Sequence, residues 1–403
     1  MTMRDRLLVY ARFIDRLAGT LLLLAFWGVL LVAFIHHMAP RLAYLTGAPI
    51  GNDLPCHTPE CDFGVFWPAG ILARAGNVSA LYDHSQFGKI AAAMLNTHGY
   101  IEHFLYPPTL LPLIGAISYL PFEQAAFAWM FGQLLLAAIL FRLARFSWPV
   151  IIAALLSPAA LFGTEIGQIG VFCDALLVAG LVLSRRNPPA GGTLLGLLAI
   201  KPQVGVLVPF ALLYRRQWRA ILFAFVAAIA LCGLATAWFG LAPWRAFLAE
   251  DHRAVGIMLN RPFDPSTYQG WGVSIFWMAR GFGAGVAVSR VLQALATAAA
   301  IVALYNFRQR RNFVELAVYL SLLASPYDFA YGMVAFSLML AESARQRGWR
   351  IGLLDALLFL WPGVCLVVSI ATGHELTPLI VLAALLRAAL PARPAVLPAP
   401  PQE

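Results

Sequence analysis

The chain contains few charged residues, and acids are the scarcest of them. Of 403 residues, 19 are Asp or Glu and 28 are Lys or Arg, so charged residues make up 12% of the sequence. A soluble domain carries about 25%. So few charges cannot coat a soluble fold of this size, which excludes a water-soluble protein. Low charge together with 12% aromatic residues also excludes an intrinsically disordered chain.

Cysteine is scarce as well, and several catalytic motifs are missing. Five cysteines in a chain of this length exclude a small fold stapled by disulfides. The sequence has no glycine-rich phosphate loop, no nucleophile elbow and no His-Glu-x-x-His motif. It therefore offers no support for nucleotide-driven or hydrolytic machinery.

Apolar sequence is abundant, and clusters of arginine interrupt it. Apolar residues make up 61% of the chain, and the net charge is +9. Positive clusters between apolar segments mark the cytoplasmic loops of a polytopic membrane protein. We therefore interpret them as topology signals and predict no nucleic-acid partner. The clusters are Arg4, Arg6, Arg12 and Arg16; Arg215, Arg216 and Arg219; Arg308, Arg310 and Arg311; and Arg345, Arg347 and Arg350.

The N-terminal part of the chain predicts one membrane helix followed by a large outer loop. Residues 17–39 contain no Asp, Glu, Lys or Arg and are long enough to cross a hydrocarbon layer about 30 Å thick. Four arginines before them place the N-terminus in the cytoplasm, so we predict an uncleaved first transmembrane helix. Residues 40–105 then form the first periplasmic loop. Within it, 63–75 and 85–96 are expected to be amphipathic helices whose apolar faces lie on the membrane surface.

From residue 107 onwards apolar segments follow in close succession, and several are too short to cross a bilayer alone. Broken helices are tolerated there only where they pack in protein or line a wet cavity. Two breaks stand out, Lys201-Pro202-Gln203 and Ser325-Pro326-Tyr327-Asp328, and both are expected to turn near the outer face. The segments are 108–120, 122–141, 149–162, 169–183, 191–214, 220–239, 284–307, 313–323, 329–340, 352–372 and 376–390.

The arginines at the end of the fourth segment pose a topology problem. Four crossings after the outer loop would leave Arg185 outside, against the positive-inside rule. Either one short segment is re-entrant, which we favour, or 191–214 is a single crossing and the rule fails at Arg185. After the last segment, the Pro- and Ala-rich residues 391–403 are expected to form a disordered cytoplasmic tail.

Asp62 is the strongest candidate for a catalytic group. It opens the short helix expected from residue 63, where unsatisfied N–H groups and the helix dipole favour an ionised carboxylate. Such a carboxylate at the membrane surface suits a general base. The structural alternative is a simple N-cap, a position at which Asp is common.

Other polar groups suggest one shared wet cavity. Lys201 lies in an apolar segment, where an ammonium is costly without a partner, and the break at Pro202 leaves room for a bound phosphate. Pairing of Lys201 with Glu165 or Asp174 is the structural alternative. Tyr106 stands where the chain re-enters the membrane, and on its own this position is typical of an interface anchor. Further cavity candidates are Gln168, His103, Tyr327 and Asp328.

Cys56-His57-Thr58-Pro59-Glu60-Cys61 allows three interpretations. Two cysteines outside the cytoplasm favour a disulfide, which would brace the loop just before Asp62. A metal site using His57, Glu60 and a thiolate, or two free thiols, are the alternatives.

Several short motifs occur in the same order as in the integral-membrane glycosyltransferases of family 87, within the GT-C superfamily, and the sequence resembles that family over residues 60 to 330. No single motif is specific, but the order is shared. The motifs are Cys61-Asp62-Phe63 with Leu81-Tyr82-Asp83; Tyr106-Pro107-Pro108; Gly167-Gln168; Lys201-Pro202-Gln203 with Arg215-Arg216-Gln217-Trp218-Arg219; and Ser325-Pro326-Tyr327-Asp328. The family often continues Gly167-Gln168 with Asn, whereas this chain has Ile169.

The resemblance implies an all-α polytopic integral membrane protein with a GT-C-type fold of about 11–13 transmembrane helices, several of them short or broken. Residues 1–390 would form one membrane-embedded catalytic domain in a bacterial-type inner membrane, with both termini cytoplasmic. It would transfer a sugar, typically mannose, from a polyprenyl-phosphate donor to a lipid, glycan or protein acceptor on the periplasmic side. The transfer would invert the anomeric centre.

The resemblance also implies roles for individual residues. Asp62 would be the base, while Lys201, Tyr106 and Gln168 would hold the donor phosphate or sugar. We predict no cofactor and no metal, with the lipid-linked sugar as co-substrate. A transporter or flippase for a lipid-linked or small anionic substrate is the alternative, because broken helices with buried charges suit that class too. A polysaccharide polymerase or ligase is a third interpretation. Such enzymes would be expected to rely on arginines in the outer loop, and this loop holds only Arg41 and Arg74.

Overall fold

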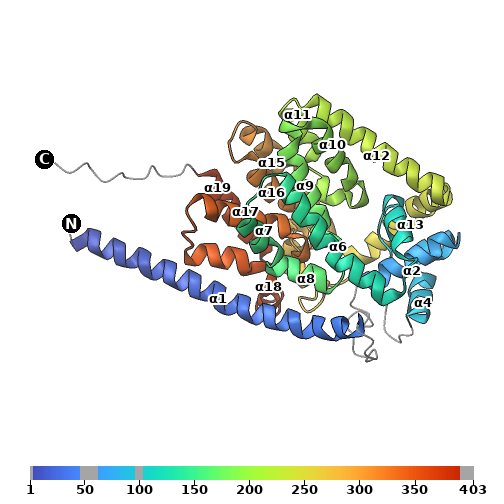
Figure 1. Cartoon of the computed structure of the whole chain (residues 1–403), viewed down its shortest axis with the longest axis horizontal. Helices are drawn as coiled ribbons and strands as arrows, with labels where there is room; N and C mark the ends of the chain where they lie inside the picture. The colour runs from blue at the N-terminus through green and yellow to red at the C-terminus, as the bar shows by residue number, and fades with distance from the viewer. Residues whose placement is uncertain (1–2, 46–61, 96–102, 391–403) are drawn as a thin grey trace.

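The computed structural model describes residues 3–45, 62–95 and 103–390, and these form a bundle of helices (Figure 1). Within these ranges the chain contains α-helices, short 3₁₀ helices and a single β-bridge between Gly272 and Phe329, and no strand. Helices α2, α4 and α13 gather at one end of the bundle, away from the end at which α1 begins (Figure 1). The predicted all-α class is confirmed.

Helix α1 (Met3–Leu45) is a single long helix on the outside of the bundle (Figure 1). In its most apolar window, 6% of the residues are buried, so its Leu, Val and Ile side chains require a lipid environment. Asp15 accepts a hydrogen bond from the backbone N–H of Leu353 at 3.1 Å, and Gly19 lies so close to Gly352 that a side chain would overlap it. These contacts fix α1 against the start of α18.

The next helices are α2 (Phe63–Arg74), α3 (Val78–Tyr82) and α4 (His84–Met94). The bounds of α2 and α4 lie within two residues of those expected. However, the expectation that the apolar face of α2 rests on the membrane surface is wrong. Gly70 packs directly against the backbone of Ile114, and the Phe63 ring lies 5.6 Å from that of Phe122. The apolar face of α2 is therefore covered by protein.

The next helices include one that is too short to cross a bilayer alone, as the sequence predicts for this region. After a 3₁₀ turn (Pro108–Leu110), α5 (Leu111–Ile117) is seven residues long and packs beside α2. Helix α6 (Phe122–Leu143) is the first full-length span after the loop. It begins beside α2, where Trp67 contacts Phe122, and carries Arg142 in its last turn.

Helices α7 (Trp148–Leu155) and α8 (Pro158–Glu165) bring the chain back to the start of α2, where the Ile166 carbonyl oxygen accepts a hydrogen bond from Phe63 N–H. The two helices are bent by 51° at their junction and together are long and apolar enough to form one span. Helix α9 (Gly170–Arg186) then runs back to Arg185 and is about 25 Å long at 1.5 Å per residue. If α5 does not cross the membrane, the positive-inside rule is met at both Arg142 and Arg185, and this topology stays a prediction.

The break at Lys201 is the tip of a helical hairpin. The ascending arm is α10 (Pro188–Gly196) with a 3₁₀ turn (Leu197–Ile200), and the descending arm is a second turn (Pro202–Gly205) with α11 (Val208–Tyr214). Pro188 and Tyr214, at the two ends, line the same pocket, so the hairpin returns to the end where it began. Gly192 and Gly196 let α10 pack backbone to backbone on α12, as small residues do between membrane helices.

The rest of the chain completes the bundle with spans and shorter helices. Phe247 of α13 contacts Tyr82 of α3, which joins this part to the outer segment. A second break separates α16 from α17, at the Ser325–Asp328 turn, and contains the 3₁₀ turn Ala330–Gly332. The helices are α12 (Trp218–Phe239), α13 (Ala242–Asn260), a 3₁₀ turn (Tyr268–Trp271), α14 (Ile275–Gly281), α15 (Val286–Phe307), α16 (Phe313–Ala324), α17 (Val334–Gln346), α18 (Leu353–Thr372) and α19 (Thr377–Ala389).

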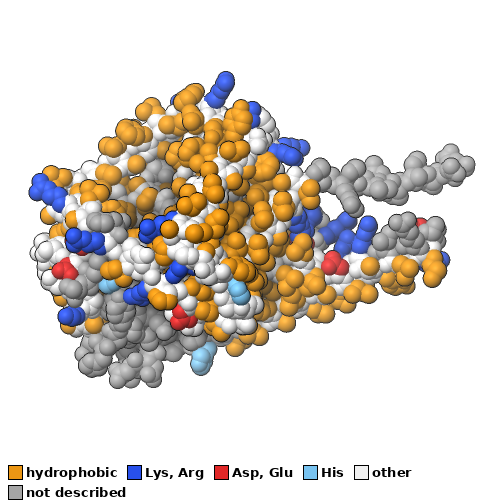
Figure 2. All heavy atoms as spheres, turned by 180° about the vertical axis from the view of Figure 1, so that it is seen from behind, with side chains coloured by type: hydrophobic (Ala, Val, Ile, Leu, Met, Phe, Trp, Pro, Cys, Tyr) orange, Lys and Arg blue, Asp and Glu red, His pale blue; other side chains and the backbone are white. Residues whose placement is uncertain are grey.

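The protein is a multi-pass membrane protein. Five described helices, α1, α6, α12, α15 and α18, are long and apolar enough to cross a membrane, and the bent α7–α8 pair makes six. The remaining apolar helices are shorter, as expected of a fold with short and broken spans, and the number of 11–13 crossings stays a prediction. Hydrophobic side chains cover most of the face shown in Figure 2, which suits contact with lipid.

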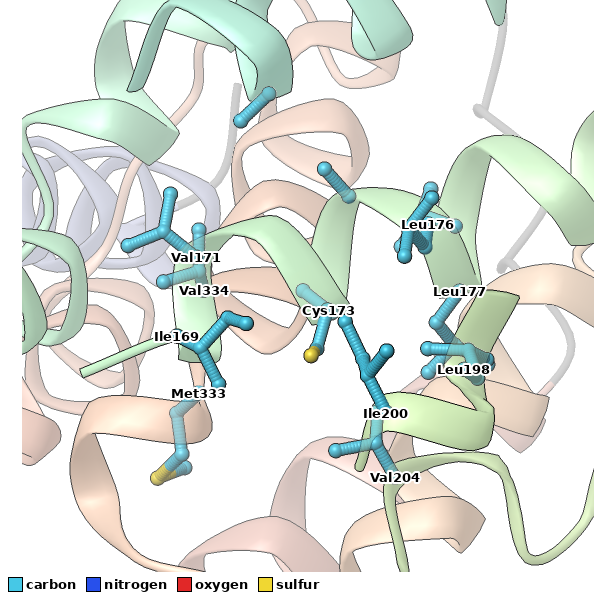
Figure 3. Packing of buried hydrophobic residues seen from close by; sticks show 14 of the residues in the cluster. Ile169, Val171, Cys173, Leu176, Leu177, Leu198, Ile200, Val204, Met333 and Val334 are labelled. Atoms are coloured by element: carbon cyan, nitrogen blue, oxygen red, sulfur yellow. The ribbon is translucent and has the colours of Figure 1, made fainter. Parts of the chain in front are cut away.

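The core surrounds α9, whose side chains are buried along most of its length. Figure 3 shows side chains of α9 converging with those of the hairpin tip and of the residues that begin α17. Cys173 lies among Ile200, Val204 and Met333 in this cluster, as expected for a small core residue. The two broken segments are thus held against one central helix.

Glu375, in the turn between α18 and α19, makes the stability of the fold depend on pH. Its side chain is fully buried, and one carboxyl oxygen accepts a hydrogen bond from the backbone N–H of Thr377 at 2.8 Å. Burial raises the pKa of Glu375 from 4.5 to about 8. The folded protein therefore holds the neutral acid, whereas the unfolded chain releases its proton above pH 4.5.

Glu375→Gln is expected to flatten the pH dependence of stability. The favourable contribution of the neutral acid is complete below pH 4.5 and is lost as pH rises towards 8, because only the unfolded state ionises in that window. The loss is at most several kcal/mol, at about 1.4 kcal/mol per pKa unit. Tm of the detergent-purified variant should exceed that of the wild type at pH 8 but not at pH 4.5. Parallel Tm curves for the two proteins would contradict this assignment.

Candidate functional site

Asp62 directs its carboxylate away from its own helix and towards a loop far along the chain. The residue is half-buried at the start of α2, and its side chain makes no capping hydrogen bond there. Instead, its Oδ2 atom accepts a hydrogen bond of 2.8 Å from Nε2 of Gln168. Asp62 thus occupies the N-cap position of α2, but its carboxylate does not cap the helix.

A tight turn between α8 and α9 places Gln168 beside Asp62. Gly167 has φ +73°, a left-handed conformation that glycine adopts at low cost. A Cβ on Gly167 would also lie 2.6 Å from the Cβ of Phe63. Nε1 of Trp129 donates a 2.8 Å hydrogen bond to the Gly167 carbonyl oxygen, and Phe63 N–H donates to the Ile166 carbonyl oxygen at 3.3 Å. Backbone contacts thus lock this turn onto the first residue of α2.

Tyr106 completes a hydrogen-bonded chain of three side chains. Its hydroxyl donates to Oε1 of Gln168 at 3.0 Å, so the one amide joins Tyr106 to Asp62. Tyr82 donates to the Tyr106 carbonyl oxygen at 3.1 Å, and the Phe66 ring lies edge-on to the Tyr106 ring at 5.0 Å. Burial raises the pKa of Tyr106 to about 12, although the charge of Lys201 lowers it. Tyr106 therefore serves as a neutral hydrogen-bond donor at physiological pH.

Lys201 brings a buried positive charge to this chain of side chains. The backbone of Lys201 is not helical (φ −145°, ψ 74°) and separates the two 3₁₀ turns at the tip of the hairpin. Its ammonium lies 5.1 Å from the centre of the Tyr331 ring. Within the described residues, its Nζ atom makes no hydrogen bond and no ion pair. The alternative of a direct ion pair with Glu165 or Asp174 is therefore wrong. Asp174 instead accepts a 2.8 Å hydrogen bond from the Ala335 N–H at the start of α17.

The second break contributes Asp328 and Tyr331 to the same region. The Asp328 carbonyl oxygen accepts a 2.9 Å hydrogen bond from Val273 N–H, which holds the loop in place. Gly332 lets this loop turn closely, because a Cβ there would lie 2.5 Å from Oδ1 of Asp328. Burial raises the pKa of Asp328, while the nearby charge of Lys201 lowers it. The sequence does not predict Tyr331, which stands in the 3₁₀ turn Ala330–Gly332, where its backbone packs closely against Gly163 and Gly170.

Some predicted residues remain outside this cluster or outside the described ranges. His103 and Tyr327 are half-buried beside Phe104 and Asp328, and their place in the cavity lining stays a prediction. Cys56 and Cys61 lie outside the described residues, so the disulfide is untested. In the part of the chain that the structure describes, no three His, Cys, Asp or Glu side chains gather in a way that could hold a metal ion.

Comparison with known proteins gives one match. The family described as Glycosyltransferase family 87 matches residues 104–326, more than half of the chain. Neither the curated proteins nor the solved structures give a match. The matched range contains Tyr106, Gln168 and Lys201, whereas Asp62 precedes it and Asp328 follows it. The hydrogen bond between Asp62 and Gln168 connects the unmatched outer segment with the matched range.

Proposed function

Because the chain belongs to glycosyltransferase family 87, it is a membrane glycosyltransferase, and we propose that it moves mannose from a polyprenyl-phosphate donor to an acceptor hydroxyl on the periplasmic side of the inner membrane. The observation that carries this proposal is the Asp62–Gln168–Tyr106 chain of hydrogen bonds beside the unpaired ammonium of Lys201. A base and a phosphate-binding cation are the two groups that such a transfer requires.

In the proposed reaction the acceptor hydroxyl attacks the anomeric carbon from the side opposite the phosphate. Its proton passes to the Asp62 carboxylate as the new C–O bond forms. The bond from the anomeric carbon to the phosphate oxygen breaks, and its electron pair leaves with the polyprenyl phosphate. One displacement inverts the anomeric centre, so a β-linked donor gives an α-linked product.

Each of the other residues has a defined task in this proposal. Gln168 orients the carboxylate of Asp62 and the hydroxyl of Tyr106, since it bonds to both. Lys201 offsets the negative charge that grows on the departing phosphate. A lipid-borne phosphate is already a good leaving group, so the reaction needs no nucleotide-binding domain. The prenyl chain would lie among the short apolar helices around the hairpin.

The transporter interpretation receives no support from the family match. Broken helices with buried charges are common to both classes, but family 87 consists of enzymes that transfer sugars. The long outer segment also packs its first helix into the site, and transport does not require such a contact.

Incubation of the purified protein with labelled polyprenyl-phosphate mannose and a membrane extract tests the donor. We expect label in a lipid, glycan or protein product, which also identifies the acceptor, and we expect the same rate in excess EDTA because no metal takes part. Transfer from a nucleotide sugar but not from the lipid-linked donor would contradict the proposed donor. Loss of transfer in EDTA, restored by a divalent cation, would contradict the metal-free mechanism.

A further inference from the structure

A basic pocket lies at the end of the bundle where the helical hairpin of residues 188–214 begins and ends. It has a volume of about 880 Å³, and its walls come from the end of α9, the start of α10, the α11–α12 turn and the end of α15. Its basic lining residues are Arg185, Arg215, Arg216, Arg219 and Arg308, and no Asp or Glu contributes to the lining. Because α9 is about 25 Å long, this pocket is separate from the cluster around Asp62.

The five arginines of this pocket lack the acidic partners that other arginines of the protein have. Arg347 and Arg387, for example, both pair with Asp355, at 2.6 and 2.7 Å. None of the five pocket arginines forms an ion pair with a described residue. Burial, and then the charge of Arg185, lower the pKa of Arg215, as expected where like charges meet without a counter-charge. An anion would relieve this repulsion.

Aromatic contacts hold two of the guanidinium groups in place without neutralising them. The Arg215 guanidinium lies 4.4 Å from the centre of the Phe313 ring, and that of Arg308 lies 3.8 Å from the centre of the Tyr305 ring. Arg308 also donates a 2.8 Å hydrogen bond to the Tyr305 carbonyl oxygen. Planar guanidinium groups held in this way suit the two-pronged recognition of phosphate oxygens.

The surroundings of the pocket favour a lipid over a soluble phosphate. Leu213 and Trp218 line the pocket and are exposed, and Leu222 continues the exposed apolar surface one turn along α12. In the most apolar window of α12, 11% of the residues are buried, so this exposed apolar surface is suited to contact with lipid. An acyl chain could therefore follow α12 while its headgroup occupies the pocket, and the volume exceeds that of a bare phosphate ion.

We propose that this pocket binds the phosphate headgroup of an anionic phospholipid, whose acyl chains lie along α12. Basic pockets between membrane helices are known to hold such headgroups. The bound lipid bridges Arg185, three residues before the hairpin begins at Pro188, and Arg215, directly after it ends at Tyr214. It thereby fastens the base of the hairpin whose tip carries Lys201. The proposal concerns lipid binding and does not depend on the sugar transfer.

Thermal unfolding of the detergent-purified full chain, with phosphatidylglycerol or phosphatidylcholine added, tests this proposal. We expect phosphatidylglycerol to raise Tm by at least about 3 °C and phosphatidylcholine to have little effect. The double variant Arg215→Gln/Arg219→Gln should bind phosphatidylglycerol at least about tenfold more weakly. The matched control is Arg310→Gln/Arg311→Gln, which removes the same charge at the same end but outside the pocket, and it should respond as the wild type does.

Three results would overturn the proposal. Equal stabilisation of both double variants by phosphatidylglycerol would show a general charge effect. Full stabilisation by soluble glycerol 3-phosphate would show an anion site without lipid preference. If the pocket variant does not fold, native mass spectrometry of the wild type from discs containing both lipids decides, because equal retention of the two lipids would contradict selective binding.

Discussion

Asp62→Asn is expected to lower the rate of sugar transfer by about a thousandfold or more while leaving the protein folded. A positioned general base contributes about 10²- to 10⁴-fold to a rate, and the amide of Asn cannot accept the acceptor proton. Asn can still accept the hydrogen bond from Nε2 of Gln168, so the contact between the outer segment and the matched range is kept. The measurement is kcat with labelled donor, alongside Tm of the same preparation.

A matched control lies in the same outer segment. Asp83 accepts a 2.7 Å hydrogen bond from Nε2 of Gln86, a local contact within three residues. Asp83→Asn removes an equal charge from this segment. Asp83 belongs to the Leu81-Tyr82-Asp83 motif but takes no part in the proposed proton transfer, so we expect transfer to stay within a few-fold of the wild-type rate. Wild-type activity in Asp62→Asn, or an equal loss of transfer activity in the two variants, would contradict the role of Asp62 as the base.

Local features of the fold could be predicted from the sequence because they depend on short stretches of chain. The start of α2 at residue 63, the break before Pro202 and the break at Pro326 follow from proline and from the alternation of polar and apolar residues. The environment of α2 could not be predicted in the same way. An apolar helix face has the same pattern whether it meets lipid or protein, and only the packing of Gly70 on Ile114 shows which occurs.

The sequence singles out the polar residues of this cluster, but it does not show the contacts between them. The sequence indicates Asp62 as a carboxylate at a helix start, Tyr106 as a residue at the membrane boundary, and Gln168 and Lys201 as polar groups at membrane depth. The bond from Gln168 to Asp62 spans 106 residues of sequence and depends on the left-handed turn at Gly167, so only the folded chain shows it. The sequence also suggests an ion pair between Lys201 and Asp174. In the structure, Asp174 instead accepts a hydrogen bond from the backbone N–H of Ala335, at the start of α17.

Lys201→Met is expected to change activity and stability in opposite directions. The ammonium is buried and makes no ion pair with any described residue, so the fold gains little from the charge, and an apolar side chain of similar length should keep or raise Tm. Loss of a group that stabilises the charge of the transition state costs about 3–4 kcal/mol, so kcat should fall by about 10²- to 10³-fold.

The other lysine of the chain provides the control for this variant. Lys89 is exposed on α4, and Lys89→Met removes the same charge without touching the cluster. We expect its transfer rate to stay near that of the wild type. A lysine with a purely structural role would instead lose Tm and activity together on substitution. The combination of unchanged or higher Tm with a lower kcat in Lys201→Met therefore distinguishes a phosphate-binding group from a structural one, because only the former holds its charge for a ligand.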